Sequence, residues 1–272
     1  LKKSKRKENL INEKDNAILS KKLARIELDA PVKIELAELP YKGKQLEPLM
    51  SFYKDMNFNG FMSRLLENSD QADLLTEDWE EVAYTHVASA EDLTVDHFPS
   101  VAAADGYAIY LENLSKNYHD SEVVAVAWTN GSEIFTGDAS LLQADLFKSW
   151  LSDEQVTKVV FDAKRTKVML DYVGIDFAGV VDDVLIGSYL LHARDNSNDL
   201  AEVAREFDMD DLSYDESIYG KGAKRGVPEE AETMYEHIAR KVHIIARLQE
   251  TIRPQLEANQ MDDLYQKMEL PL

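Results

Sequence analysis

The chain has 272 residues, of which 44% are hydrophobic, and it carries a formal net charge of −21. This composition is typical of a globular protein with one large domain and room for a smaller appendage. No apolar run approaches the ~20 residues of a membrane span, and the charged first residues lack the apolar core of a signal peptide. The lack of cysteine excludes disulfides and thiolate metal sites, and we expect a cytoplasmic protein that does not contact a membrane.

The charge is unevenly distributed along the chain. Residues 1–25 contain nine Lys and Arg against three Asp and Glu, a net of +6, which leaves −27 for the rest. An acidic body repels the phosphate backbone of a nucleic acid at long range, whereas a basic segment attracts it. We interpret these basic residues as the solvated face of a helix. Contact with DNA through residues 2–25 is the alternative.

The first third of the chain is predicted to be a small, mostly helical segment. Residues 1–27 are expected to form a helix that needs a partner surface, because their apolar residues are only loosely spaced at helical intervals. Residues 32–36 alternate as a short exposed strand does, and residues 47–66 are a second helical region, broken near residues 57–60. Residues 69–81 are acidic and polar, which is typical of a tether.

The main domain is predicted to begin at about Val82 and to carry its strands first. Strand patterns occupy residues 82–87, 106–113, 123–128, 133–135 and 158–161. Asn130 and Gly131 mark a hairpin turn between two of them. The run GYAIYLEN at residues 106–113 is apolar, as is a central strand that is buried on both faces of a sheet. It ends on the carboxylate Glu112, a residue type that binds metals.

Helical patterns alternate with these strands and fill the second half of the domain. They cover residues 89–98 with Ser89 as N-cap, 140–151, 163–172, 182–192, 198–207, 229–253 and 262–268. Gly174 and Pro254 are stop signals for two of these helices. Strands that alternate with helices predict an α/β domain with a mixed sheet flanked by helices.

Residues 208–228 are predicted to be a loop, which contains the sequence YGKGAKRG. Its glycines and the cations Lys221, Lys224 and Arg225 suggest a phosphate cradle, but the Walker spacing is absent. No GxGxxG opens a helix after a strand either. We interpret the segment as a mobile surface loop. Contact with a neighbouring domain or with a nucleic-acid backbone is the alternative.

Several segments resemble the 3′–5′ exonuclease-like domain of bacterial DNA polymerase I. They are KNYHDSEVVAVAWTN, FDAKRTKVML, GVVDDVLIGSYLLHA and YGKGAKR, with the ending LYQKMELPL, which looks like the junction to a polymerase domain. LSKKLARIELDAPVKIEL and FYKDMNFNGFMSRL resemble the tail of the preceding 5′-nuclease domain and its linker. The resemblance implies that residues 1–68 are that tail, 69–81 a tether, and 82–272 a ribonuclease-H-like exonuclease domain. Its partners would be the polymerase and 5′-nuclease domains of the same parent chain, and DNA through the parent enzyme.

The resemblance also implies where a metal site would lie. Proofreading members hold two Mg²⁺ or Mn²⁺ ions on four acidic residues from three segments, and a tyrosine helps to place the attacking water. The matching positions here are Tyr110 and Glu112 on the central strand, Thr166 in KRTKV, and His237 and Lys241 in HIARK. One carboxylate of four remains, and one position carries a cation. We therefore expect a vestigial site with no catalytic residue, no metal and no other cofactor.

Electrostatics supports this expectation. Glu112 supplies one negative charge and Lys241 one positive charge, so the site is near neutral. An ammonium several ångströms away repels a dication by several kcal/mol at an effective dielectric constant near 20. Glu112 is expected to be a remnant or a hydrogen-bonded residue at the rim. The preferred hypothesis is thus a fragment of DNA polymerase I whose dead exonuclease-like domain is a scaffold for the polymerase domain, with weak DNA binding of its own.

Two alternatives involve nearby side chains. Asp162, Asp182 and Asp183 could rebuild the metal site of a working exonuclease, although Asp at the start of a helix is typically a cap. His237 and His243 are six residues apart on one helix and do not share a face. We interpret His237 as a surface or packing histidine. The last alternative is an interaction module that contacts DNA without any chemistry of its own.

Overall fold

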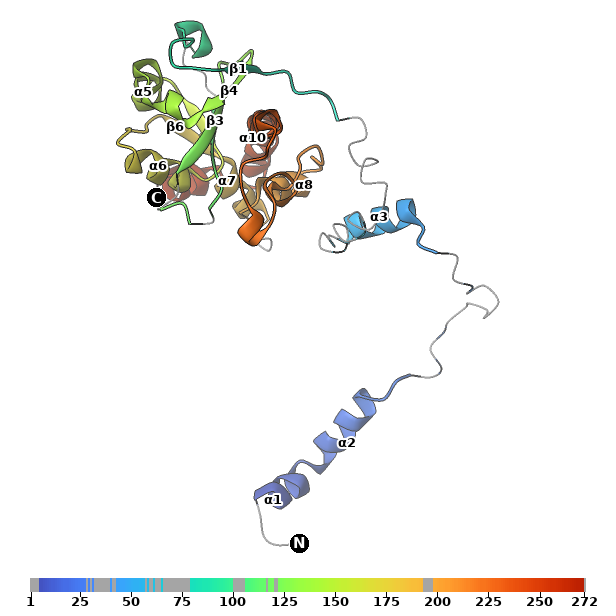
Figure 1. The fold of residues 1–272 in the computed structure, drawn as a ribbon. Coiled ribbons are helices and arrows are strands. Elements are labelled where there is room, and N and C mark those ends of the chain that lie inside the picture. Colours follow the sequence, from blue (N-terminus) through green and yellow to red (C-terminus); the bar gives the residue numbers. More distant parts are fainter. Residues whose placement is uncertain are drawn as a thin grey trace. The chain divides into compact units, whose positions relative to one another are not determined.

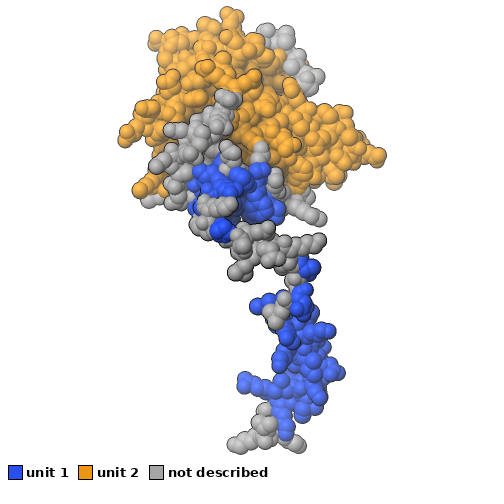
Figure 2. Space-filling model, turned by 90° about the vertical axis from the view of Figure 1, so that its right-hand side faces the viewer, with its two compact units in different colours: residues 1–77 blue, residues 78–272 orange. Residues whose placement is uncertain are grey.

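The computed structural model describes residues 5–27, 43–56, 79–99, 106–115, 117–119, 122–192 and 198–271, together with residues 29, 31, 40, 58, 61 and 65. The chain divides into two compact units, Leu1–Glu77 and Asp78–Leu272, which Figure 1 shows as a ribbon and Figure 2 colours separately. The strand expected at residues 32–36 and most of the expected tether, residues 69–78, lie outside the described residues.

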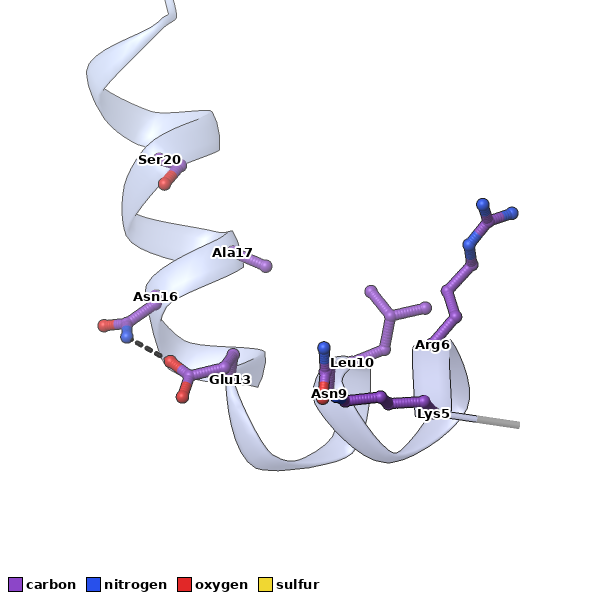
Figure 3. Close-up of a pocket in the computed structure, with 8 residues that line it drawn as sticks. All are labelled: Lys5, Arg6, Asn9, Leu10, Glu13, Asn16, Ala17 and Ser20. Carbon is purple, nitrogen blue, oxygen red and sulfur yellow. Dashed lines mark hydrogen bonds between the residues drawn. The ribbon is translucent and has the colours of Figure 1, made fainter. Parts of the chain in front are cut away.

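Within its described residues, the first unit contains three short helices. They are α1 (Lys5–Asn12), α2 (Lys14–Leu23) and α3 (Leu46–Asp55), so the single helix expected over residues 1–27 is divided near Glu13. No residue of α1 or α2 is buried, and such short helices without packing are marginal in water. Figure 3 shows a hollow along these two helices, which is lined by Lys5, Arg6, Asn9, Leu10, Glu13, Asn16, Ala17 and Ser20.

The second unit is built on a mixed sheet, whose order over the described residues is β1-β4-β3-β2-β5-β6. The strands are β1 (Thr85–Val87), β2 (Tyr107–Asn113), β3 (Val123–Thr129), β4 (Ile134–Asp138), β5 (Lys158–Val160) and β6 (Val180–Asp183). β2 is antiparallel to β3 but parallel to β5, which is parallel to β6. The C-terminal ends of β2, β5 and β6 therefore share one edge of the sheet.

Helices cover both faces of this sheet (Figure 1). The helices are α5 (Asp145–Ser152), α6 (Ala163–Tyr172), α7 (Val184–Leu191), α8 (Leu200–Glu206) and α10 (Ala231–Ala258). One core lies between the sheet and α5 and α6, and contains Ile109 and Leu111 of β2. The other lies under α7, α8 and α10, and contains Ala108 and Tyr110. Since side chains alternate along a strand, Glu112 lies on the same face as Tyr110, which we call the α10 face.

The sequence-based boundaries are wrong at two of the expected helices that flank the first strands. Residues 89–98 form turns and only a short 3₁₀ helix, η3 (Val95–His97), because Thr94 and His97 cap each other within that one turn. The helix expected at residues 140–151 is interrupted at Ala144, between the 3₁₀ helix η4 (Ala139–Gln143) and α5. Ser89 bonds the side chain of Asp92 and starts no helix.

Three further corrections concern the second half of the domain. Asp182 and Asp183 belong to β6, so the helix expected from residue 182 begins at Val184. The loop expected at residues 208–228 contains α9 (Asp215–Tyr219) and the 3₁₀ turn η5 (Gly222–Lys224). α10 continues through Pro254, although proline inside a helix costs about 3 kcal/mol, because Ile252 and Leu256 around it are fully buried.

The described part of the chain ends with α11 (Asp262–Leu264) and a π-helical turn, η6 (Tyr265–Glu269), where a helix was expected. Tyr265 is fully buried on the α10 face. Over the residues described, none of the helices combines the length and the apolar character that crossing a bilayer requires.

Candidate active site

Glu112 lies near the C-terminal end of β2 and is fully buried. Its Oε1 accepts the backbone N–H of Asn113 at 3.1 Å. Its Oε2 accepts the hydroxyl of Tyr219 at 2.9 Å and the ammonium of Lys241 at 2.6 Å. Three donors hold this carboxylate in place, as expected of a hydrogen-bonded residue, but its full burial contradicts the expected position at the rim of the site.

Lys241 of α10 places a positive charge at the centre of the site. Its Nζ lies 2.6 Å from Glu112 Oε2 and 2.7 Å from Asp215 Oδ1. It also lies 3.3 Å from the hydroxyl of Tyr110 and 4.5 Å from the centre of that ring. Burial disfavours the charged amine, but the two carboxylates outweigh it and raise the pKa of Lys241 well above its ordinary value. Lys241 is therefore an ammonium at neutral pH.

Asp215, the first residue of α9, is a second carboxylate of the site that the sequence analysis missed. Its Oδ1 accepts a hydrogen bond from Nε2 of His237 at 3.0 Å, and its Oδ2 lies 3.4 Å from Nη2 of Arg225. Burial opposes its ionisation, but Lys241 and His237 hold the pKa of Asp215 well below its usual range. The only signal in the sequence was its position just before the YGKGAKRG segment.

His237 is buried, so of the two expected roles, surface or packing, the structure shows packing. Burial and the neighbouring Lys241 lower the pKa of the imidazole, so the ring is neutral at pH 7. It packs edge-on against the ring of Tyr219 at 5.6 Å. We refer to this group of contacting residues as the Glu112 cluster: Tyr110, Glu112, Asp215, Tyr219, His237 and Lys241.

Thr166 takes no part in the cluster, although it matches a metal-binding position of the family. Its hydroxyl donates to the backbone carbonyl of Asp162 at 3.0 Å, which is common for Thr inside a helix. The preceding Arg165 reaches the edge of the cluster instead. Its guanidinium donates to the carbonyl of Leu111 at 3.0 Å and to the side chain of Asn113.

The other carboxylates at this edge of the sheet act as caps and anchors. Asp162 accepts the N–H of Arg165 at the start of α6, and Asp183 caps α7. Asp183 also accepts the N–H groups of Asp162 and Ala163, and burial raises the pKa of its carboxyl to about 6. Asp182 receives hydrogen bonds from three side chains of the C-terminal part of the chain, Gln249, Arg253 and Tyr265. His243 lies apart from the cluster, beside Arg247.

Residues 215–226 close over the end of β2. Tyr219 is buried with its hydroxyl on Glu112, and Nε of Arg225 donates to the carbonyl of Leu114 at 2.7 Å. The N–H of Gly226 donates to the carbonyl of Tyr219 at 2.9 Å, which ties the last residue of the segment to the end of α9. The segment is thus anchored to the strand that carries Glu112, and Arg225 points toward the site.

The cluster offers three possible metal ligands. Glu112, Asp215 and His237 each bring one ligand atom to within 4.8 Å of the others. A pair of Mg²⁺ ions requires oxygen ligands and several negative charges. Here two carboxylates face a lysine that lies within hydrogen-bond distance of both. With Lys241 in this position, the residues do not fit two magnesium ions.

Comparisons with known proteins agree with the fold. The family model described as "DNA polymerase I, ribonuclease H-like domain" matches residues 109–248. Brucella melitensis NrnC superposes with a TM-score of 0.53 at 19% identity, over 68% of this chain and 87% of that one. Escherichia coli RNase D, an exoribonuclease, has a TM-score of 0.50 at 16% identity, over 65% of this chain and 46% of that one. The second unit therefore has the ribonuclease H-like fold of 3′–5′ exonuclease domains.

Sequence relatives define the family. DNA polymerase I of Bacillus subtilis is 34% identical over 98% of this chain, and that of Geobacillus stearothermophilus is 35% identical over 100% of it. The chain belongs to the bacterial DNA polymerase I family, as its sequence motifs predict. It spans 29% and 30% of the lengths of these two relatives.

Proposed function

We propose that this chain is the part of a bacterial DNA polymerase I that carries a catalytically inactive exonuclease-like domain. In this proposal the domain is a scaffold for the polymerase domain in DNA replication and repair. The observation that supports it best is the ammonium of Lys241, held at 2.6 and 2.7 Å from the two carboxylates of the site. A dication at these carboxylates would lie beside a fixed positive charge, and repulsion at that distance amounts to several kcal/mol.

The closed segment over the site gives independent support. Tyr219 and Arg225 hold residues 215–226 against the end of β2. A DNA 3′ end that approached Glu112 would have to displace this segment and break those hydrogen bonds. Loss of metal ligands and obstruction of the site thus act in the same direction, so restoring one carboxylate would not by itself restore cleavage.

The direct test is an activity assay with a 5′-labelled single-stranded oligonucleotide in low salt, with Mg²⁺ or Mn²⁺. We expect no shortening of the oligonucleotide at its 3′ end by the full chain. Glu112→Ala is the matched control, because a contaminating nuclease would act equally in both preparations. Trimming that requires the metal and disappears in Glu112→Ala would contradict the proposal.

A working exonuclease rebuilt from displaced carboxylates has little support. Asp162 and Asp183 accept backbone N–H groups as helix caps, and Asp182 is engaged by Tyr265. None of these three residues contributes to the only group of potential metal ligands found among the described residues.

The partners follow from the family. We infer that the other domains of the same parent chain contact this one, that DNA binds mainly through them, and that the enzyme is cytoplasmic. The basic residues of α1 and α2 are exposed and remain the best candidates for a direct contact with DNA. Such binding would weaken steeply with salt, because it depends on contacts between cations and phosphates.

A further inference from the structure

We propose that the ammonium of Lys241 is the resident cation of a site that holds a single cation and is formed by three side chains, Glu112, Asp215 and His237. When Lys241 is shortened, this site accepts one dication of intermediate softness, such as Zn²⁺. The inference rests on the proposed function, because it starts from a site in which lysine has replaced the metal pair. It differs in ligand set and in metal from a pair of ions held by carboxylates alone.

The position of Nζ is the first argument. It lies 2.6 Å from Glu112 Oε2 and 2.7 Å from Asp215 Oδ1, so two anionic oxygens already converge on one cationic centre. The three potential ligand atoms lie within 4.8 Å of one another. Zinc bonds of about 2.0–2.2 Å in tetrahedral geometry place ligand atoms roughly 3.4 Å apart. A small inward movement of the side chains therefore converts the ammonium site into a metal site.

The residues around the ligands are the second argument. The N–H of Asn113 and the hydroxyl of Tyr219 orient the carboxylate of Glu112. Arg225 lies beside Oδ2 of Asp215 and leaves Oδ1 directed at the cation. Partners that orient ligands in this way commonly contribute a factor of about 10–100 in metal affinity. The site is therefore held in a cation-binding arrangement by groups that do not depend on Lys241.

The chemistry of the ligands determines which metal fits. Two carboxylate oxygens and one imidazole nitrogen suit Zn²⁺ or Co²⁺, whereas Mg²⁺ prefers oxygen ligands in octahedral geometry. Without Lys241, the buried carboxylate of Glu112 and the partly buried carboxylate of Asp215 are left around one shared cation position. A dication would restore the charge balance that the ammonium provides now. His237 binds through Nε2 as the neutral tautomer that carries its proton on Nδ1, since a neutral imidazole is the ligand form.

The experiment uses the full chain with Lys241→Ala, stripped of metal with EDTA. We expect the variant to melt at a lower temperature than the wild type, to bind one Zn²⁺ per chain in calorimetry, and to regain thermal stability when Zn²⁺ is added. Co²⁺ should give visible absorption bands of a protein-bound ion, and Mg²⁺ at the same concentration should have no effect. Adding His237→Gln to Lys241→Ala should weaken Zn²⁺ binding by about tenfold or more.

Lys158→Ala is the matched control, because Lys158 is also a fully buried lysine. It is the first residue of β5, so it lies at the edge of the sheet opposite to the one that carries Glu112. This variant should lose stability without recovering it in Zn²⁺. If Lys241→Ala fails to fold in EDTA, recovery of folded protein on refolding with Zn²⁺ supports the proposal. If neither Lys241→Ala nor Lys241→Ser responds to Zn²⁺ in folding or in calorimetry, the proposal is wrong, while the absence of exonuclease activity stands. Binding of two ions by the wild type with trimming of DNA would instead overturn the proposed function.

Discussion

Replacing Lys241 by Met tests whether the ammonium holds the site together. The side chain is buried with Nζ on both Glu112 and Asp215, so Met removes the charge but keeps a similar volume. Removing one partner of a buried ion pair costs about 3–5 kcal/mol, because the remaining charge is left unpaired. For a domain of this size that corresponds to a fall in melting temperature of roughly 6–20 °C.

Urea denaturation of the wild type, Lys241→Met, Glu112→Gln and the double variant measures the coupling between the two residues. Because Glu112→Gln removes a carboxylate that has lost its ammonium, the double variant should be more stable than Lys241→Met alone, with a coupling of about 1–3 kcal/mol. Lys167→Met is the control, since Lys167 forms an exposed ion pair with Asp171 that is worth at most about 1 kcal/mol. The reasoning is refuted if Lys241→Met lies within about 1 kcal/mol of the wild type, or if Glu112→Gln destabilises it further.

Three other predictions concern residues outside the ion pair. Tyr265→Phe should lower the unfolding free energy by about 1–3 kcal/mol in urea denaturation, because buried Asp182 and the N–H of Asp183 both lose their hydrogen bond to the tyrosine hydroxyl. Tyr172→Phe, at an exposed position, is the control and should leave the unfolding free energy unchanged. Burial lowers the pKa of Lys158 to about 8, so the unfolding free energy of the wild type should rise between pH 8 and 10.5 by up to about 1.4 kcal/mol per pH unit. In that pH range the folded state binds fewer protons than the unfolded state, so raising the pH favours folding. The rise should be absent in Lys158→Met and present in the control Lys164→Met, which changes an exposed lysine. Arg225→Ala should speed amide hydrogen exchange at Tyr219 and Gly226, because it removes the hydrogen bond that holds residues 215–226 to Leu114. Lys224→Ala is the control, and equal exchange rates in the two variants would argue against this anchor.

The sequence predicted the fold class because the strongest signals are local. The apolar run of β2 is buried along its whole length, and α6 has the predicted bounds. β6 was missed because Asp182 and Asp183 read as the start of a helix, although they end a strand of four residues. The long helix was predicted to end before Pro254, but α10 continues to Ala258 because buried residues on both sides of the proline pack against the core.

The site could be predicted only in part, because two of the six residues of the Glu112 cluster, Asp215 and Tyr219, are brought to it by tertiary contacts. The family motifs identify Tyr110 and Glu112 on β2 and His237 and Lys241 on α10, two elements far apart in the sequence. Asp215 and Tyr219 belong to a helix of five residues inside a predicted loop, and no spacing rule connects them to β2. With these two residues, the site is not an isolated carboxylate beside a lysine but a network in which Glu112 and Lys241 have further hydrogen-bond partners.

The central claim is that an ammonium has replaced the metal ions of this site. Calorimetric titration of the metal-free wild type with Mn²⁺ near pH 7.5 tests it most directly, because it measures binding without requiring catalysis. We expect the titration to show no Mn²⁺ binding that depends on the Glu112 cluster, so that the wild type and Glu112→Ala give the same trace. Binding of two Mn²⁺ ions per chain that is lost in Glu112→Ala would contradict it.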